Sequence, residues 1–185
     1  MKYFYRPFYF SLTFCLIIAS CSTQKNRFLN KQYHSINTKY NVVFNGKEAL
    51  KVGEDILNAT IEDNFFEIIK TDPILLKGEN FDDNTIVPGF DKAEEKAVKA
   101  IQKHSMNIEG AQKNSYIDEA YLLLGKARYY DRRFFPAIEA FNFLLDNGTD
   151  ESVYIEGRIW REKTNIRLQN NQIAINNLRP LARQL

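Results

Sequence analysis

The stretch from Ser115 to Asp146, SYIDEAYLLLGKARYYDRRFFPAIEAFNFLLD, constrains the fold more than any other part of the chain. Its apolar residues recur at helical spacing on both sides of a short polar turn, which predicts two amphipathic helices joined as a hairpin. Small residues at Gly125 and Ala137 allow two antiparallel helix backbones to approach closely. Pro136 fits the first turn of the second helix, where its missing N–H has no partner to lose. We therefore expect a helical hairpin built to stack on others.

The pattern resembles that of the tetratricopeptide repeat, a helix pair of about 34 residues. Tyr121 and Leu124 match the bulky residue and the leucine of its first helix, and Phe141 matches the aromatic residue of its second. Ala174 and Leu178 echo the second helix 37 residues further along. The resemblance implies an all-α fold of stacked helical hairpins, an α-solenoid.

The second copy of the pattern is degenerate. Arg161 and Glu162 replace the Leu124–Gly125 pair, although residues 169–171 supply the expected polar turn. Pro180 should end or kink the last helix. Because no capping helix follows, we expect the chain to be the N-terminal part of a longer solenoid or a prematurely ended gene product.

The N-terminus carries the features of an export signal. Lys2 and Arg6 precede an apolar run, residues 8–18, that is too short to span a bilayer as a permanent helix. The run ends in two small residues before Cys21, which resembles the lipobox of bacterial lipoproteins. That resemblance implies a signal peptide over 1–20 and a fatty-acylated Cys21 that anchors the protein in a membrane. The alternative is an ordinary secretory signal.

Loss of residues 1–20 leaves 23 basic and 23 acidic residues, a balance that does not point to a nucleic-acid partner. Cys15 leaves with the signal and Cys21 carries lipid, so no cysteine is left for a disulfide or a metal site. We predict no metal and no cofactor.

Residues 21–37 are polar with scattered aromatic side chains, and we predict a coiled, lipidated tether that lifts the domain off the membrane. No acidic run follows Cys21, which favours the periplasmic face of the outer membrane. His34 lies in this tether without a metal-ligand partner nearby, and we expect it to be solvated.

The repeat domain should occupy residues 38–185. A helix over 38–59 is predicted to bury Tyr40, Val43, Phe44, Leu50, Leu57 and Ile61, with Gly46 and Gly53 marking a close neighbour or a bend. Residues 60–89 lose the helical period and form an insert, which is either a partner-docking arm or a plug over the end of the stack.

A clearer helix begins at Asp91, which we expect to cap it together with Glu94. Small residues at positions 93, 97 and 100 predict tight packing against another helix. His104 should interact with the negative end of that helix, with no second titratable group beside it.

Catalytic motifs are missing from the sequence. It contains no phosphate-binding glycine loop, no zinc-protease motif and no nucleophile elbow, and adjacent acids such as Glu94–Glu95 point apart on a helix. We therefore expect a binding protein, with no catalytic residues and no small-molecule substrate.

In tetratricopeptide repeats the first helices of successive pairs line a concave groove. Carried over from Gly125, the resemblance implies groove positions that could hold an extended peptide. The alternative for Tyr129 and Tyr130 is that they pack the hairpin. The groove positions are Glu119, Leu122, Lys126, Tyr129 and Tyr130, echoed at Glu156, Ile159, Lys163, Ile166 and Arg167.

The lipobox is followed in order by NTKYNVVFNGKEAL, DNFFEII, FDKAEEKAVKAIQKHSM and DEAYLLLGKARYYDRRFFPAIEAFN. This succession resembles the N-terminal region of the SprE/PorW family of lipoproteins, which serve type IX secretion and gliding motility. The resemblance implies a non-catalytic scaffold that joins the secretion translocon to ring and motor components. Two alternatives are a lipoprotein of outer-membrane-protein assembly and a SusD-like glycan-binding lipoprotein, which should carry exposed tryptophans.

Overall fold

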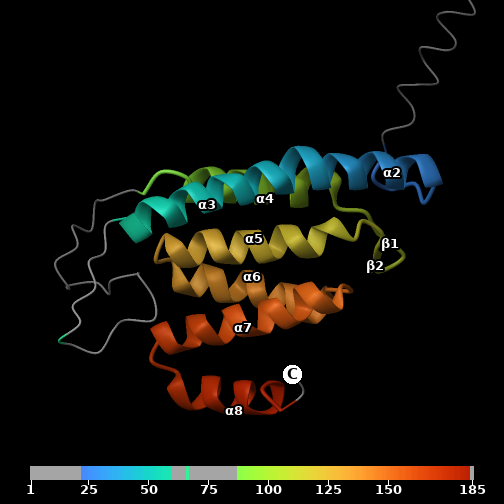
Figure 1. The fold of residues 1–185 in the computed structure, drawn as a ribbon. Coiled ribbons are helices and arrows are strands. Elements are labelled where there is room, and N and C mark those ends of the chain that lie inside the picture. The colour runs from blue at the N-terminus through green and yellow to red at the C-terminus, as the bar shows by residue number, and fades with distance from the viewer. Residues whose placement is uncertain (1–21, 60–65, 67–86, 184–185) are drawn as a thin grey trace, which may run out of the picture.

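The computed structural model describes residues 22–59, 66 and 87–183 (Figure 1). These residues are mostly helical, which confirms the predicted all-α class. The predicted signal peptide, Cys21 and residues 60–65 and 67–86 of the predicted insert lie outside this part. In chain order the elements are α2 (Phe28–Ile36), η1 (Asn37–Val43), α3 (Phe44–Ala59), α4 (Phe90–His104), β1 (Asn107–Ile108), β2 (Ala111–Gln112), α5 (Tyr116–Tyr130), α6 (Phe134–Asn147), α7 (Glu151–Arg167) and α8 (Asn171–Leu181).

The described helices form three antiparallel pairs stacked in chain order: α3 with α4, α5 with α6, and α7 with α8 (Figure 1). Helix α5 lies in the middle and packs against α4, α6 and α7. It is therefore apolar on most of its circumference, and Leu122, Leu123 and Leu124 are all buried in succession. The short β1–β2 hairpin connects α4 to α5, and sequence reasoning did not predict it.

The central hairpin forms where the sequence predicts it. Gly125 faces the ring of Phe141, and a Cβ atom at Gly125 would lie only 2.2 Å from Cε1 of that ring. Ala137 and Phe141 are fully buried, and Pro136 lies in the first turn of α6. The small residue on α5 is thus the direct cause of the close approach of α6.

The α7–α8 pair is held differently, which explains its degenerate sequence. Glu162, which stands at the position equivalent to Gly125, is buried in α7 and accepts hydrogen bonds from Asn165 Nδ2 at 2.7 Å and from Asn177 Nδ2 on α8 at 3.0 Å. Arg161 completes the pairing of this carboxylate at 2.7 Å. A satisfied polar network replaces the glycine–aromatic contact of the first pair.

Helix α4 packs through its predicted small residues. Ala93, Ala97 and Ala100 are fully buried, and Gly46 and Gly53 of α3 contact α4, as expected of a close neighbour. The predicted cap was wrong. Gly89, with a φ of 115°, precedes the helix, Asp91 lies inside its first turn, and the structure shows no side-chain cap. Gly89 has this role because a positive φ suits glycine.

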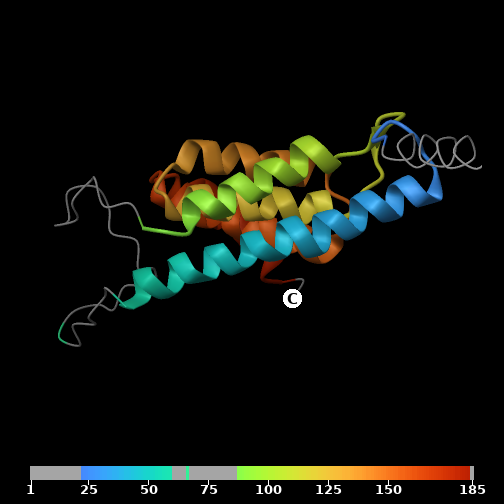
Figure 2. The same ribbon diagram turned by 90° about the horizontal axis from the view of Figure 1, so that it is seen from above.

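The prediction of a coiled tether was also wrong for residues 28–37. Helices α2, η1 and α3 form one long rod across the stack (Figure 2). Asn30 donates from Nδ2 to the carbonyl of Ser22 at 2.8 Å, so even the residue after Cys21 is held against α2. Sequence reasoning missed this helix because its inward residues are polar: Asn30, His34 and Thr38 are buried.

The π-helix η1 keeps these inward residues in line. Asn30, His34, Thr38 and Val42 recur every four residues, a step that would drift around an ordinary α-helix. Thr38 Oγ1 donates to the His34 carbonyl at 2.7 Å, a side-chain bond that competes with the regular backbone hydrogen bonds of the helix.

The buried face predicted for the helix over 38–59 is only partly right. Val43, Leu50 and Leu57 are buried, Tyr40 and Phe44 are exposed, and Ile61 lies outside the described residues.

No helix in the described part of the chain combines the length and the apolar character needed to cross a membrane.

Candidate functional site

The predicted groove positions come from α5 and α7, which pack against each other. Lys126 on α5 forms an ion pair with Glu156 on α7, and Glu119 forms one with Lys47 on α3. The structure therefore brings together groove positions that are far apart in the sequence. Partly exposed pairs of this kind add little stability but fix the register of the first helices.

An aromatic cluster formed by Tyr129, Tyr130 and Trp160 joins the C-terminal ends of α5 and α7. The Tyr129 ring meets Trp160 edge-on at 5.3 Å, and Tyr130 stacks on Phe90 at 5.0 Å. Arg167 Nε donates to the Tyr129 hydroxyl at 3.2 Å. The two tyrosines therefore hold α4, α5 and α7 together, which was the alternative interpretation of these residues.

Two predicted groove residues are not accessible to a partner. Tyr129 is fully buried and Leu122 is 5% exposed, so neither can contact a bound peptide in this structure. The error has a physical cause: α5 is packed on several sides, and the repeat pattern alone did not show how much of it its neighbours cover.

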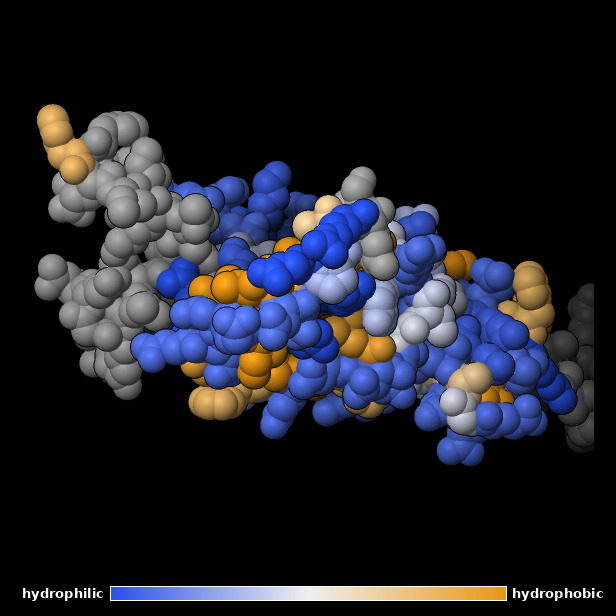
Figure 3. Space-filling model, turned by 90° about the horizontal axis from the view of Figure 1, so that it is seen from below, coloured by the Kyte–Doolittle hydropathy of each residue, from blue (hydrophilic) through white to orange (hydrophobic). Residues whose placement is uncertain are grey.

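The predicted groove positions that stay accessible include lysine and isoleucine side chains. Lys163 Nζ lies 4.4 Å and Lys126 Nζ 5.1 Å from the centre of the Trp160 ring, both within cation–π range. Ile159 and Ile166 on α7 are 42% and 49% exposed. Figure 3 shows hydrophobic side chains among hydrophilic ones on the face that α7 and α8 form. Such a surface suits a protein segment better than a strongly charged ligand.

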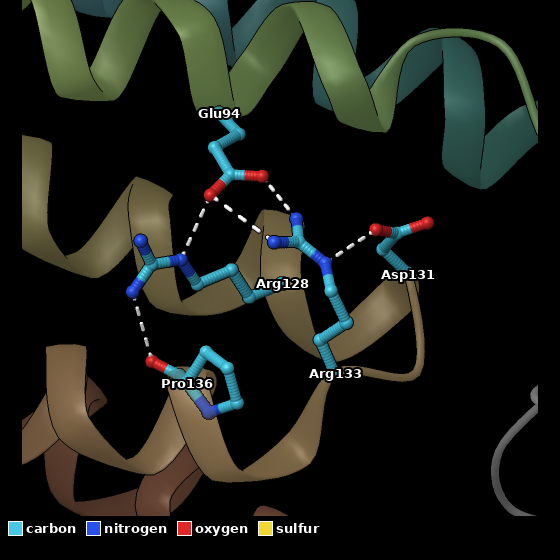
Figure 4. Close-up of polar contacts among 5 residues, drawn as sticks. All are labelled: Glu94, Arg128, Asp131, Arg133 and Pro136. Carbon is cyan, nitrogen blue, oxygen red and sulfur yellow. Dashed lines mark hydrogen bonds and ion pairs between the residues drawn. The ribbon is translucent and has the colours of Figure 1, made fainter.

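Glu94 is the centre of an ion-pair network that ties α4 to the central hairpin (Figure 4). It accepts from Arg128 Nε at 2.9 Å and pairs with Arg133, and Arg128 also donates to the Pro136 carbonyl at 3.1 Å. Burial alone would raise the pKa of Glu94, but hydrogen bonds from Arg133 and Arg128 outweigh it and lower the pKa below its ordinary value. The carboxylate in turn raises the pKa of Arg133. These charged side chains therefore hold α4 against the α5–α6 hairpin.

Asp118 secures the connection between α6 and α7. Its Oδ2 atom accepts from the backbone N–H groups of Thr149 at 2.7 Å and Asp150 at 3.0 Å. The same carboxylate borders a hollow of about 340 Å³, also lined by Tyr121 and Phe143. Burial raises the pKa of Tyr121, so its hydroxyl is neutral at physiological pH. Of the two acids that border this hollow, Asp118 and Asp146, Asp118 is thus engaged in holding the turn between α6 and α7.

The buried His34 and the half-buried His104 form a pair that sequence reasoning did not predict. Their Nδ1 atoms lie 3.0 Å apart, which requires one ring to donate and the other to accept. His34 is 3% exposed, so the expectation that it is solvated was wrong. His104 does have a titratable neighbour. Burial first, and then the charges of His34 and Lys99, lower the pKa of His104.

Comparison with known proteins gives no assignment. No protein-family model matches the chain, and no curated protein matches it. Within the described residues, no group of three or more histidine, cysteine or acidic side chains is placed to hold a metal ion.

Trp160 is the groove residue that sequence reasoning missed. The sequence contains part of the evidence for this contact, because Lys163 follows Trp160 by three residues and so lies on the same face of the helix. The contribution of Lys126 could not be read from the sequence, because it comes from another helix. The predicted groove positions thus lie on two packed helices, α5 and α7, and their acids Glu119 and Glu156 are engaged in ion pairs.

Proposed function

We propose that this chain is a lipid-anchored, non-catalytic scaffold of the type IX secretion and gliding-motility machinery, and that it binds other proteins through stacked tetratricopeptide-like repeats. It would be attached to the outer membrane through Cys21 and face the periplasm. Its partners would be the secretion translocon and the ring and motor components.

The observation that supports the repeat part of the proposal is the contact between Gly125 and Phe141, while the secretion and membrane parts rest on the order of the sequence motifs and on the lipobox. The repeat register places these two residues opposite each other, and the helix pair is packed through them. Helices α5 and α7 pack against each other, as the first helices of neighbouring repeats would. A repeat scaffold uses such a face to hold an extended segment of a partner.

The surroundings of Trp160 favour protein binding over glycan binding. A glycan-binding site of this kind needs an open aromatic face. The Trp160 ring instead lies beneath the ammonium groups of Lys163 and Lys126 and against the edge of Tyr129. It is therefore engaged in holding α5 to α7.

The proposal is tested by cross-linking intact cells, isolating the protein from the outer membrane and identifying attached proteins by mass spectrometry. Recovery of translocon and ring components is the expected result. Recovery of barrel-assembly subunits or of a nutrient transporter would refute the secretion assignment.

The anchor is tested separately with Cys21→Ser. This variant should lose incorporation of labelled palmitate, whereas Cys15→Ser should keep it. Membrane attachment without acylation in the parent chain would show that the lipobox assignment is wrong.

A further inference from the structure

One face of the N-terminal rod is apolar and uncovered by any described element. Its residues follow one another at steps of four, three, four and four, so they form a continuous stripe along α2, η1 and the start of α3. Each is between 46% and 68% exposed. The N-terminal stripe consists of Leu29, Tyr33, Ile36, Tyr40 and Phe44.

The charge around this stripe is of one sign. Residues 22–47 contain five basic residues and no acidic one, whereas residues 48–185 contain 18 basic and 23 acidic residues. The balanced charge of the chain after residue 20 therefore does not show that residues 22–47 are basic and the rest is acidic. Lys25 and Arg27, just before α2, form no ion pair with any described residue, and Lys39 lies 5.1 Å from the centre of the Tyr40 ring at the edge of the stripe.

The stripe also begins beside the predicted anchor. Ser22, which follows Cys21, is held to Asn30 of α2 by a 2.8 Å hydrogen bond. If Cys21 carries acyl chains, α2 has no spacer that could lift it away from the lipid surface. The exposed tyrosines suit the boundary between headgroups and acyl chains, where amphipathic rings gather.

We propose that the N-terminal stripe docks on an anionic lipid surface, so that α2 and η1 lie in the membrane interface. Basic residues beside an apolar helical face are what such binding requires. The acidic remainder of the chain would be repelled by the same surface, which would turn the α5–α7 face toward the periplasm. The proposal rests on the proposed function only in placing the chain beside a membrane.

Tryptophan fluorescence of the full chain in phosphatidylglycerol vesicles tests this placement. Tyr40→Trp puts a probe on the stripe, and Tyr154→Trp puts a matched probe on the exposed surface of α7. Vesicles whose acyl chains carry bromine should quench the first probe and leave the second unchanged. Emission of the parent chain, which contains only Trp160, gives the background.

Charge is tested with the triple variant Lys25→Gln, Arg27→Gln and Lys39→Gln in the Tyr40→Trp chain. Near an anionic surface each basic residue changes the ratio of docked to undocked molecules roughly fivefold, so three should change it on the order of a hundredfold. In phosphatidylglycerol vesicles the triple variant should therefore be quenched less than the Tyr40→Trp chain. The Tyr40→Trp chain itself should be quenched less in neutral phosphatidylcholine vesicles. Lys92→Gln, Lys99→Gln and Lys103→Gln on α4 are the control and should have no such effect.

The outcomes separate the inference from the proposed anchor. A chain that floats with the vesicles but leaves the Tyr40→Trp probe unquenched refutes the docking alone, and a protein partner would then be the candidate for the stripe. Quenching that is insensitive to the triple variant refutes recognition of anionic lipid. A chain that does not associate with vesicles at all refutes the docking, while labelled palmitate in Cys21 would still support the anchor.

Discussion

Replacement of Gly125 by alanine tests the packing of the central hairpin. The added Cβ would lie 2.2 Å from Cε1 and 2.5 Å from Cζ of Phe141, well inside ordinary contact distance. Phe141 is fully buried, so its ring has no adjacent solvent to move into. Overpacking of a core costs about 1–3 kcal/mol, and this overlap belongs at the upper end. The higher helix propensity of alanine than of glycine offsets about 1 kcal/mol of this cost. The expected net loss of stability is about 2 kcal/mol.

The measurement is urea unfolding followed by circular dichroism. With a slope of about 2 kcal/mol per molar urea, the midpoint of Gly125→Ala should fall by about 1 M. Gly157→Ala is the matched control in α7. Its Cβ would meet only the end of a flexible side chain, Leu144 Cδ2 at 2.7 Å, with the next contacts at 3.5 Å. It should change stability by less than about 1 kcal/mol, because the gain in propensity offsets the adjustment.

A double variant identifies the cause. Phe141→Leu shortens the side chain, so combining it with Gly125→Ala should cost less than the sum of the single changes by at least about 1 kcal/mol. A Gly125→Ala protein as stable as the parent, or strict additivity in the double variant, would refute the argument that this contact sets the approach of α6.

Three further predictions concern polar groups and are checked by urea midpoints. Asp118→Ala should lower stability by about 1–2 kcal/mol, because two backbone donors at the α6–α7 connection lose a charged acceptor; an unchanged midpoint would contradict this. Because folding lowers the pKa of Glu94, its contribution should be complete above its ordinary value of 4.5 and be lost as pH falls through the lowered pKa, and Glu94→Gln should remove this dependence. Folding also lowers the pKa of His104, so stability should be complete above 6.5 and decline as pH falls below it. His104→Gln should flatten that decline, and an equally steep decline would rule out the histidine pair as its source.

The helices that were predicted well are those whose packing follows from side-chain size. Gly125 and Phe141 mark the α5–α6 hairpin, and Ala93 and Ala97 mark the buried face of α4. These signals are local, because a small residue at helical spacing has the same meaning wherever the neighbouring helix comes from.

The parts that were missed depend on polar groups paired across long distances in sequence. Asn114 donates from Nδ2 to Thr38 Oγ1 at 2.9 Å and to the His104 carbonyl at 2.9 Å, and so joins η1 to the end of α4. A polar inward face looks solvated until its partners are known, so α2 was expected to be coil and His34 to be exposed. The same limit applied to the groove, where burial of Tyr129 depends on Trp160 from another pair.

The most direct test of the scaffold proposal is site-specific photo-cross-linking in living cells. A photoreactive phenylalanine analogue at Ile159 would probe the α5–α7 face, and one at Ile175 would probe α8 with similar exposure, 42% against 47%. The proposal predicts adducts with secretion-machine components from Ile159 and few or none from Ile175. Equal labelling from both positions, or adducts from Ile159 only with proteins outside the secretion machinery, would contradict it.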